Sequence, residues 1–318
     1  MMTTKIAAAL IATGAALALA TAVEAQDRLK LAVGQRGLWE QSPPELGQKA
    51  GIFKKHGLEL EILYTAGAGE TIQAVVSGSV DIGIGAGFGG VMGAFTKGAP
   101  VRIIANAMIG AHDLYWYVPA DSPIKTLKDA GGKTIAFSTR GSSTNIVVLG
   151  FLKHYGIDAK PTATGGPPAT FTQVMSKQID VGWGAAPFGM KDYQEGRIRL
   201  VARGSDVPAI RDQTVRVQIT NVDTLTKRKD AVARFVRAWT ETLDWMYTDA
   251  GVKAYSEFMS LPEAQVKRTR EEFYPKENQN PGRIGNLEQA MADAVEYKFI
   301  AAPLTKAQLD ELLQLQLK

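Results

Sequence analysis

Cysteine is absent from the 318-residue sequence, and histidine occurs only three times. Without cysteine there can be no disulfide, no thiolate metal site, no cysteine nucleophile and no lipid-modified cysteine behind a leader. His56, His112 and His154 are scattered, so they predict no metal site. We therefore expect neither a bound metal nor another cofactor.

An excess of charge of one sign is also missing, because 36 Lys and Arg residues face 32 Asp and Glu residues. The basic residues are spread along the chain, which is typical of a solvated surface and argues against nucleic-acid binding. No segment after the first 25 residues is apolar enough to span a membrane.

The first 25 residues have the pattern of a secretory signal. A short basic lead precedes an Ala/Leu-rich apolar run over residues 6–22, and Val23-Glu24-Ala25 offers small residues for cleavage before Gln26. We expect residues 1–25 to be a signal peptide and the mature protein to be soluble and exported. The alternative is an uncleaved membrane anchor.

The chain contains an internal repeat. Residues 51–90 align without a gap to residues 150–189, an offset of 99. Identical pairs include Thr65/Thr164, Gly67/Gly166, Thr71/Thr170 and Asp81/Asp180. An accidental match of glycine-rich segments is the alternative. The two aspartates precede predicted strands, so we interpret them as structural turn residues and not as an acid/base pair.

Each copy of the repeat has the pattern of an α/β unit. The expected strands are 29–33, 58–64, 80–84, 134–137 and 179–183, and the expected helices are 44–56, 70–77, 142–155 and 170–176. Alternating strands and helices predict a largely parallel sheet, flanked by helices, in each of two lobes. Ligands of such sheets bind beyond the carboxyl ends of the strands, which here would face each other across a cleft.

Two crossings connect the predicted lobes. Strands over 101–108 and 114–118 flank a short hinge, Gly110-Ala111-His112-Asp113, and a second crossing returns near 215–220. We expect lobe one to comprise residues 26–112 and 213–318, and lobe two residues 113–212. The last part is helical, with one apolar face made of Val232, Phe235, Val236, Trp239, Leu243 and Met246. Capping-box spacing begins at Ser260 and at Thr305.

Several of these segments resemble a known family. Ala50-Gly51-Ile52-Phe53, Gly57-Leu58-Glu59, Asp81-Ile82-Gly83, Leu127-Lys128-Asp129 and Gly141-Ser142-Ser143 are similar to the nitrate, taurine and aliphatic-sulfonate solute-binding proteins of ABC importers, a superfamily that includes thiamine-pyrimidine-precursor binders. The resemblance implies a type II periplasmic-binding-protein fold. It also implies a periplasmic monomer that binds a small-molecule ligand and has as partners an ABC permease and its ATPase.

One segment departs from the family pattern. Members often carry Trp-Asp before a Pro-aromatic pair, whereas Ala185-Ala186 precede Pro187-Phe188 here. The exchange removes bulk and a charge from an expected pocket wall, so a taurine or sulfonate identity does not transfer directly.

The residues expected to bind the ligand follow the predicted strands. The segment 138–144 runs into a helix N-terminus, where free N–H groups, serine hydroxyls and Arg140 favour a carboxylate or sulfonate. For this segment the alternative is a serine that only caps the helix and an arginine that is solvated. The glycines could instead form ordinary turns. The tryptophans could instead pack in the core. The complete expected set is Gln35, Arg36, Trp39, Gly67, Gly69, Gly85, Ala86, His112, Ser138, Arg140, Ser142, Ser143, Gly166, Trp183 and Ala185.

The function expected from these features is capture of a small organic anion by closure of two lobes. A binder of a pyrimidine-like or aromatic compound and a ligand sensor for a receptor are the alternatives. The family that this chain resembles also has enzymes with the same fold among its relatives. These are a thiamine-pyrimidine synthase and a desulfinase, and both depend on cysteine. This chain has no cysteine, so we expect it not to be an enzyme.

Overall fold

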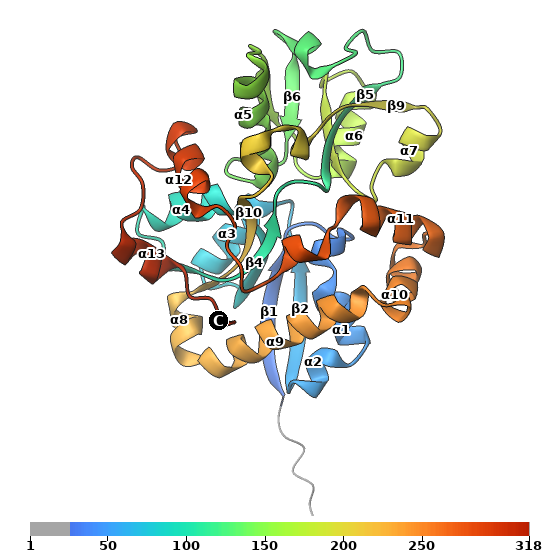
Figure 1. Cartoon of the computed structure of the whole chain (residues 1–318). Coiled ribbons are helices and arrows are strands. Elements are labelled where there is room, and N and C mark those ends of the chain that lie inside the picture. The colour runs from blue at the N-terminus through green and yellow to red at the C-terminus, as the bar shows by residue number, and fades with distance from the viewer. Residues whose placement is uncertain (1–25, 318) are drawn as a thin grey trace, which may run out of the picture.

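The structure is a computed structural model that describes residues 26–317, so the predicted signal peptide lies outside the described residues. Figure 1 shows two lobes of sheet and helix, one above the other. The strands are β1 Asp27–Val33, β2 Leu58–Tyr64, β3 Ile82–Gly87, β4 Val101–Ile109, β5 Leu114–Pro119, β6 Thr134–Phe137, β7 Lys160–Ala163, β8 Gly182–Ala185, β9 Ile198–Arg203 and β10 Thr214–Asn221.

The helices are distributed over the whole described chain. They are α1 Pro43–Lys49, α2 Ile52–Lys55, α3 Ala68–Val76, α4 Phe88–Phe95, α5 Ser143–Tyr155, α6 Pro167–Met175, α7 Met190–Gln194, α8 Val222–Lys227, α9 Lys229–Met246, α10 Asp249–Met259, α11 Glu263–Phe273, α12 Leu287–Glu296 and α13 Lys306–Leu312. Short 3₁₀ turns include η1 Trp39–Gln41 and η4 Pro208–Ile210. None of the described helices is both long and apolar enough to cross a membrane.

The lower lobe is built on a five-stranded mixed sheet in the order β2-β1-β3-β10-β4. β1 runs parallel to β2 and β3, whereas β10 runs antiparallel to β3 and β4. The predicted apolar face of α9 is buried, as expected, and most of it belongs to one apolar cluster with β1, β2, β3 and α2. The other face of the sheet is covered by α3, α4 and α12. Helices on both faces explain why β3 and β10 are buried along their whole length.

The upper lobe contains the antiparallel sheet β8-β5-β9 and the parallel pair β6-β7. An isolated parallel bridge between Ile135 and Val181 connects them. Trp116 on β5 packs edge-on against Phe151 of α5, with ring centroids 4.8 Å apart. The predicted class, two α/β lobes with mixed sheets, is confirmed. The sheets are less parallel than the sequence predicts, because every pairing made by β5 or by β10 is antiparallel.

The internal repeat forms equivalent hydrogen bonds in both lobes. The hydroxyls of Thr65 and Thr71 lie 2.8 Å apart, and those of their counterparts Thr164 and Thr170 lie 2.7 Å apart. Asp81 accepts a hydrogen bond from the Lys30 N–H in the middle of β1, and Asp180 accepts one from the Thr134 N–H at the start of β6. Each aspartate therefore bonds to the first strand of its unit, a contact beyond the structural turn role that the sequence predicts.

Two local predictions are wrong. The expected helix 44–56 is two helices, because Gly51 adopts a left-handed conformation (φ +77°) that ends α1 before α2 begins. The expected capping box at Ser260 does not form. Ser260 instead closes α10 with φ +54°, and Pro262 precedes α11. The box between Thr305 and Gln308 is present.

The two crossings between the lobes lie side by side. The Gly110 N–H, after β4, donates to the Gln213 carbonyl, before β10, at 2.8 Å. Gly110 has φ +72°, a conformation that glycine adopts without strain. The expected boundaries at 112/113 and 212/213 fall in these crossings, and they remain a prediction of how the chain divides into domains.

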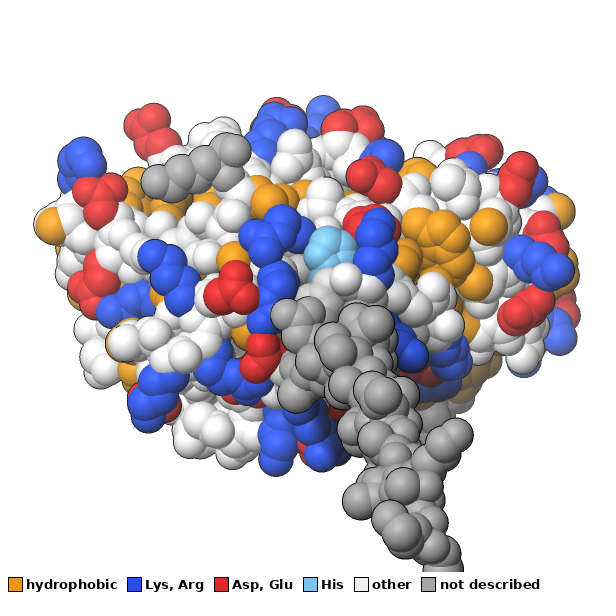
Figure 2. All heavy atoms as spheres, turned by 90° about the horizontal axis from the view of Figure 1, so that it is seen from below, with side chains coloured by type: hydrophobic (Ala, Val, Ile, Leu, Met, Phe, Trp, Pro, Cys, Tyr) orange, Lys and Arg blue, Asp and Glu red, His pale blue; other side chains and the backbone are white. Residues whose placement is uncertain are grey.

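Surface charges of both signs are mixed. The underside of the lower lobe shows Lys and Arg side chains interspersed with Asp and Glu (Figure 2). Exposed ion pairs such as Lys55–Glu241 at 2.8 Å and Arg28–Glu61 at 3.0 Å are typical of this lobe. Each such pair contributes about 0–1 kcal/mol to stability, and no uniform basic face is presented in this view.

Candidate functional site

A small cavity lies between the lobes, just beyond the carboxyl ends of β1 and β6. It is lined by Gly34, Gln35, Leu38, Gln41, Ala68, Gly85, Leu114, Ser138, Ser142, Ser143, Thr144, Trp183 and Arg216. Its volume is about 20 Å³, which is room for about one water molecule. This is the position that the strand directions predict for a ligand.

The N-terminus of α5 forms the wall of the cavity on the side of lobe two. Ser142 caps the helix by accepting a hydrogen bond from the Asn145 N–H at 3.2 Å. The Thr144 hydroxyl lies 2.8 Å from the Ser142 hydroxyl and accepts from the Ser138 N–H at 2.8 Å. The N–H groups of Ser143 and Thr144 belong to the first turn, where no helix carbonyl can accept them. The cavity wall is thus the positive end of a 13-residue helix.

Two glutamines contribute amides from lobe one. The Gln41 side-chain oxygen accepts from the Gln35 N–H at 2.7 Å, and its nitrogen donates to Glu40 at 3.1 Å. The Gln41 amide rests on Gly85, where a Cβ atom would lie 2.7 Å from its carboxamide carbon. Gly85 also has φ +75°. Glycine is therefore required there by both the close approach and the backbone conformation.

A buried ion-pair cluster lies directly behind the cavity. The Arg216 guanidinium on β10 donates to Glu40 at 2.8 Å and to Asp113 at 2.5 Å, and all three side chains are at most 3% exposed. Two carboxylates share one cation, so full ionisation leaves one net negative charge. Burial raises the pKa of Glu40, although Arg216 opposes that rise. Arg216 is thus already neutralised by the protein and brings no free positive charge to a ligand.

The pH dependence of stability should report on Glu40. An acid whose pKa is raised on folding binds more protons in the native state, so stability falls as pH rises from the ordinary glutamate value of 4.5 through the raised pKa. We expect Glu40→Gln to flatten this fall, since glutamine cannot ionise. Urea unfolding midpoints between pH 4.5 and 8 measure the slope. Glu59→Gln, at an exposed position of β2, should keep the wild-type slope; equal slopes in all three proteins would contradict the assignment.

Beside the cavity the lobes touch mainly through the backbone of glycine residues. The Gly90 N–H donates to the Gly141 carbonyl at 3.1 Å, and the Gly69 N–H donates to the Thr139 hydroxyl at 3.1 Å. A Cβ atom on Gly87 would lie 2.1 Å from the Gly141 carbonyl oxygen. With these contacts formed, the two lobes are closed on each other.

The structure brings together part of the predicted ligand-binding set. Gln35, Gly85, Ser138, Ser142, Ser143 and Trp183 line the cavity. Gly67, Gly69 and Gly166 lie beside it at the lobe contact, where added Cβ atoms would lie 3.4 Å, 3.4 Å and 2.8 Å from Thr139 or Gln35 of the opposite lobe. These three glycines permit the approach of the lobes instead of lining the cavity.

The remaining predicted residues lie elsewhere. Trp39 is 1% exposed and packs against Tyr247 and Tyr255, with ring centroids 5.6 and 4.9 Å away, so core packing is the correct alternative. Arg36 is exposed, with its guanidinium 4.6 Å above the Phe258 ring. The others outside the lining are Ala86 and Ala185, buried in strands, His112, half-buried in the crossing, and Arg140, exposed.

Several lining residues were missed by sequence reasoning. Gln41 lies in the stretch after β1 that the sequence did single out, and Thr144 belongs to the segment 138–144. Their polar side chains, close to the end of a predicted strand, could have identified both as lining residues. Arg216 had no such signal, because it comes from β10 and reaches the cavity only through the fold.

Comparisons with known proteins agree with this geometry. The profile of the NMT1/THI5-like proteins matches residues 44–250. The 4-amino-5-hydroxymethyl-2-methylpyrimidine phosphate synthase THI11 of Saccharomyces cerevisiae is 23% identical over 238 residues, which are 70% of this chain and 69% of the relative.

Solved structures show the same fold. The alkanesulfonate-binding protein SsuA of Xanthomonas axonopodis pv. citri, bound to MOPS, superposes with a TM-score of 0.71 at 19% identity over 91% of this chain and 94% of its own. The periplasmic nitrate-binding protein NrtA of Synechocystis PCC 6803 gives a TM-score of 0.68 at 14% identity over 90% and 85%. The chain therefore has the periplasmic-binding-protein fold.

Proposed function

Because the chain belongs to the NMT1/THI5-like family and closes two lobes over a polar cavity, we propose that it is a solute-binding protein for a small organic anion. The observation that carries the proposal is the N-terminus of α5, which presents unpaired N–H groups and the Ser142 and Ser143 hydroxyls to the cavity. A carboxylate or sulfonate is the group that such a terminus stabilises.

Capture requires the lobes to separate. The closed cavity of about 20 Å³ has no room for an organic acid, since it holds about one water molecule. In the proposed cycle the solute enters between open lobes, the crossings at Gly110 and Gln213 bend, and the lobes close on the solute. The closed form, a monomer in the periplasm, then docks on an ABC permease, which works with its ATPase. The related SsuA and NrtA structures, which are named as binding proteins, support this cycle.

We propose no chemical reaction at this site, although the yeast relative is named as a synthase. The chain contains no cysteine. The Ser138, Ser142 and Thr144 hydroxyls in the cavity wall bond to one another or to backbone N–H groups, and no histidine or lysine lines the cavity. Among residues 26–317, no group of three His, Cys, Asp or Glu side chains is placed to hold a metal.

A thermal-shift screen of protein refolded from denaturant tests the proposed function. The panel contains nitrate, sulfonates, aliphatic and aromatic carboxylates, and pyrimidines. A ligand at 100 times its dissociation constant adds about 2.7 kcal/mol of stability, which raises Tm by several degrees in a protein of this size. Selective stabilisation by carboxylates or sulfonates supports the proposal; stabilisation by pyrimidines alone would contradict the anion assignment.

Two variants then test where the anion binds. Ser143→Ala should weaken the anion identified in the screen about tenfold, or ~1.4 kcal/mol, because it removes a hydroxyl at the helix end. Arg140→Ala should change the affinity less than twofold, since Arg140 is exposed and outside the lining. Calorimetry measures both. A larger loss in Arg140→Ala than in Ser143→Ala would move the anion to the rim of the cleft.

A further inference from the structure

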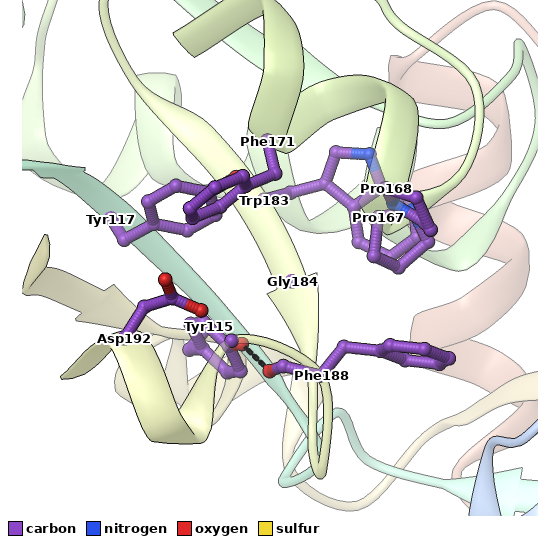
Figure 3. Close-up of a pocket in the computed structure, with 10 residues that line it drawn as sticks. Tyr115, Tyr117, Pro167, Pro168, Phe171, Trp183, Gly184, Phe188 and Asp192 are labelled. Atoms are coloured by element: carbon purple, nitrogen blue, oxygen red, sulfur yellow. Dashed lines mark hydrogen bonds between the residues drawn. The ribbon is translucent and has the colours of Figure 1, made fainter. Parts of the chain in front are cut away.

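A larger pocket lies in lobe two, and Trp183 lines both this pocket and the interlobe cavity. Its volume is about 250 Å³. Its walls carry the aromatic side chains of Tyr115, Tyr117, Phe171, Trp183 and Phe188, with Gly184 of β8 between them (Figure 3). Five aromatic residues around one hollow form a wall of ring surfaces, and only Trp183 among them also lines the proposed anion site.

The polar atoms of two of these rings are already engaged. The Tyr115 hydroxyl donates to the Phe188 carbonyl, and the Trp183 indole N–H donates to the Gly165 carbonyl at 3.1 Å. Glycines on β8 allow the tyrosine rings to lie close to the strand, because a Cβ on Gly184 would lie 2.5 Å from Tyr115. The Tyr115 and Trp183 rings are therefore fixed in place with their polar groups satisfied.

Asp192 is the charged residue in this pocket wall. It reaches in from α7, and its carboxylate is directed between Tyr115 and Tyr117 (Figure 3). One carboxylate oxygen pairs with Arg197 at 2.5 Å, but Arg197 is half exposed and also contacts Glu195 at 3.2 Å. Glu195 is also paired with Lys191 at 3.7 Å, so two cations face two carboxylates in this cluster. The second Asp192 oxygen has no ion-pair partner among the described residues, and it is the atom available to a cation in the pocket.

The tyrosines remain neutral at physiological pH. Burial raises the pKa of Tyr117, and the neighbouring Asp192 carboxylate raises it further. Burial likewise raises the pKa of Tyr115, together with Tyr117 and Asp192. Neutral aromatic rings present an electron-rich face, which attracts a cation.

We propose that this pocket binds an aromatic ammonium compound, with its ring against Phe171 and Trp183 and its cationic nitrogen directed to Asp192. The aromatic walls favour a flat apolar ring, and the carboxylate together with the tyrosine faces favours a positive charge. The assignment does not depend on anion binding between the lobes, since the two sites share only Trp183 among their lining residues.

Calorimetry with benzylammonium, neutral benzyl alcohol and anionic benzoate tests the assignment on the purified protein. Benzylammonium should bind at least tenfold more tightly than benzyl alcohol. Asp192→Asn should remove that preference while benzyl alcohol still binds, and Phe171→Leu should weaken both. Asp223→Asn, at a 71% exposed position of α8, is the matched charge control and should leave both affinities unchanged.

Two further readouts separate this site from the interlobe cavity and guard against misfolding. Intrinsic fluorescence should change on adding benzylammonium to the wild type and not to Trp183→Phe, and circular dichroism checks each variant. Ser143→Ala should leave benzylammonium binding unchanged. Anion binding and benzylammonium binding can therefore each be contradicted without the other. Equal binding of benzylammonium and benzyl alcohol by the wild type, or an unchanged preference in folded Asp192→Asn, would overturn the proposal.

Discussion

Replacing Arg216 by methionine is expected to lower the free energy of unfolding by about 3–5 kcal/mol. The substitution leaves Glu40 and Asp113 buried at 1% and 0% exposure without the cation that both contact. An uncompensated buried carboxylate must either stay charged in a medium of low polarity or take up a proton, and both cost stability.

Urea unfolding followed by circular dichroism measures the loss. Arg28→Met removes an arginine that is 63% exposed and paired with Glu61 at 3.0 Å, and it should cost less than ~1 kcal/mol. Adding Glu40→Gln and Asp113→Asn to Arg216→Met should recover part of the stability, because the buried charges are then gone. A loss equal to that of the Arg28 control would show that the buried carboxylates do not need the Arg216 cation.

Replacing Gly87 by alanine should weaken solute binding about a hundredfold, or ~2.7 kcal/mol, without preventing folding. Gly87 has φ −67°, which any residue adopts, so alanine is compatible with the local backbone. The added methyl would instead lie 2.1 Å from the Gly141 carbonyl oxygen and 2.6 Å from the Ser142 Cα atom of lobe two. The variant should therefore stay open, and apparent affinity falls with the closed fraction.

Small-angle scattering and calorimetry together test this expectation. With the solute found in the screen, the wild type should contract and Gly87→Ala should keep the dimensions of the open form. Gly131→Ala is the control, since a Cβ there meets no atom within 4 Å and φ is −54°. Normal affinity and normal contraction in Gly87→Ala would mean that the backbone contact between the lobes is not part of the binding-competent state.

The local elements were largely predictable from the sequence. The helix capped by Ser142 and ended by Gly156 appears as α5, because a serine cap and a left-handed glycine act through hydrogen bonds a few residues away. The repeat predicted equivalent roles for Asp81 and Asp180, and both hold the first strand of their unit. The helix break at Gly51 was missed, because a glycine within an apolar pattern does not reveal the sign of its φ angle.

The site was only partly predictable, for a reason that Trp39 and Arg140 illustrate. Both lie next to strand ends, where the sequence places ligand-binding residues, yet Trp39 turns into the core against Tyr255 and Arg140 points to solvent. Periodicity locates a residue along the chain but does not give the direction of its side chain in a loop. That direction depends on distant partners.

What the sequence by itself determined is the architecture: two related α/β units, two crossings and a helix N-terminus at their meeting point. These follow from hydrogen-bonding and hydrophobic patterns that span a few residues or one repeat. What only the tertiary structure decided is the charge of the cavity wall. Arg216 meets Glu40 and Asp113 across 176 and 103 residues of sequence. No local pattern encodes a contact at that separation, because it forms only when both crossings are folded side by side.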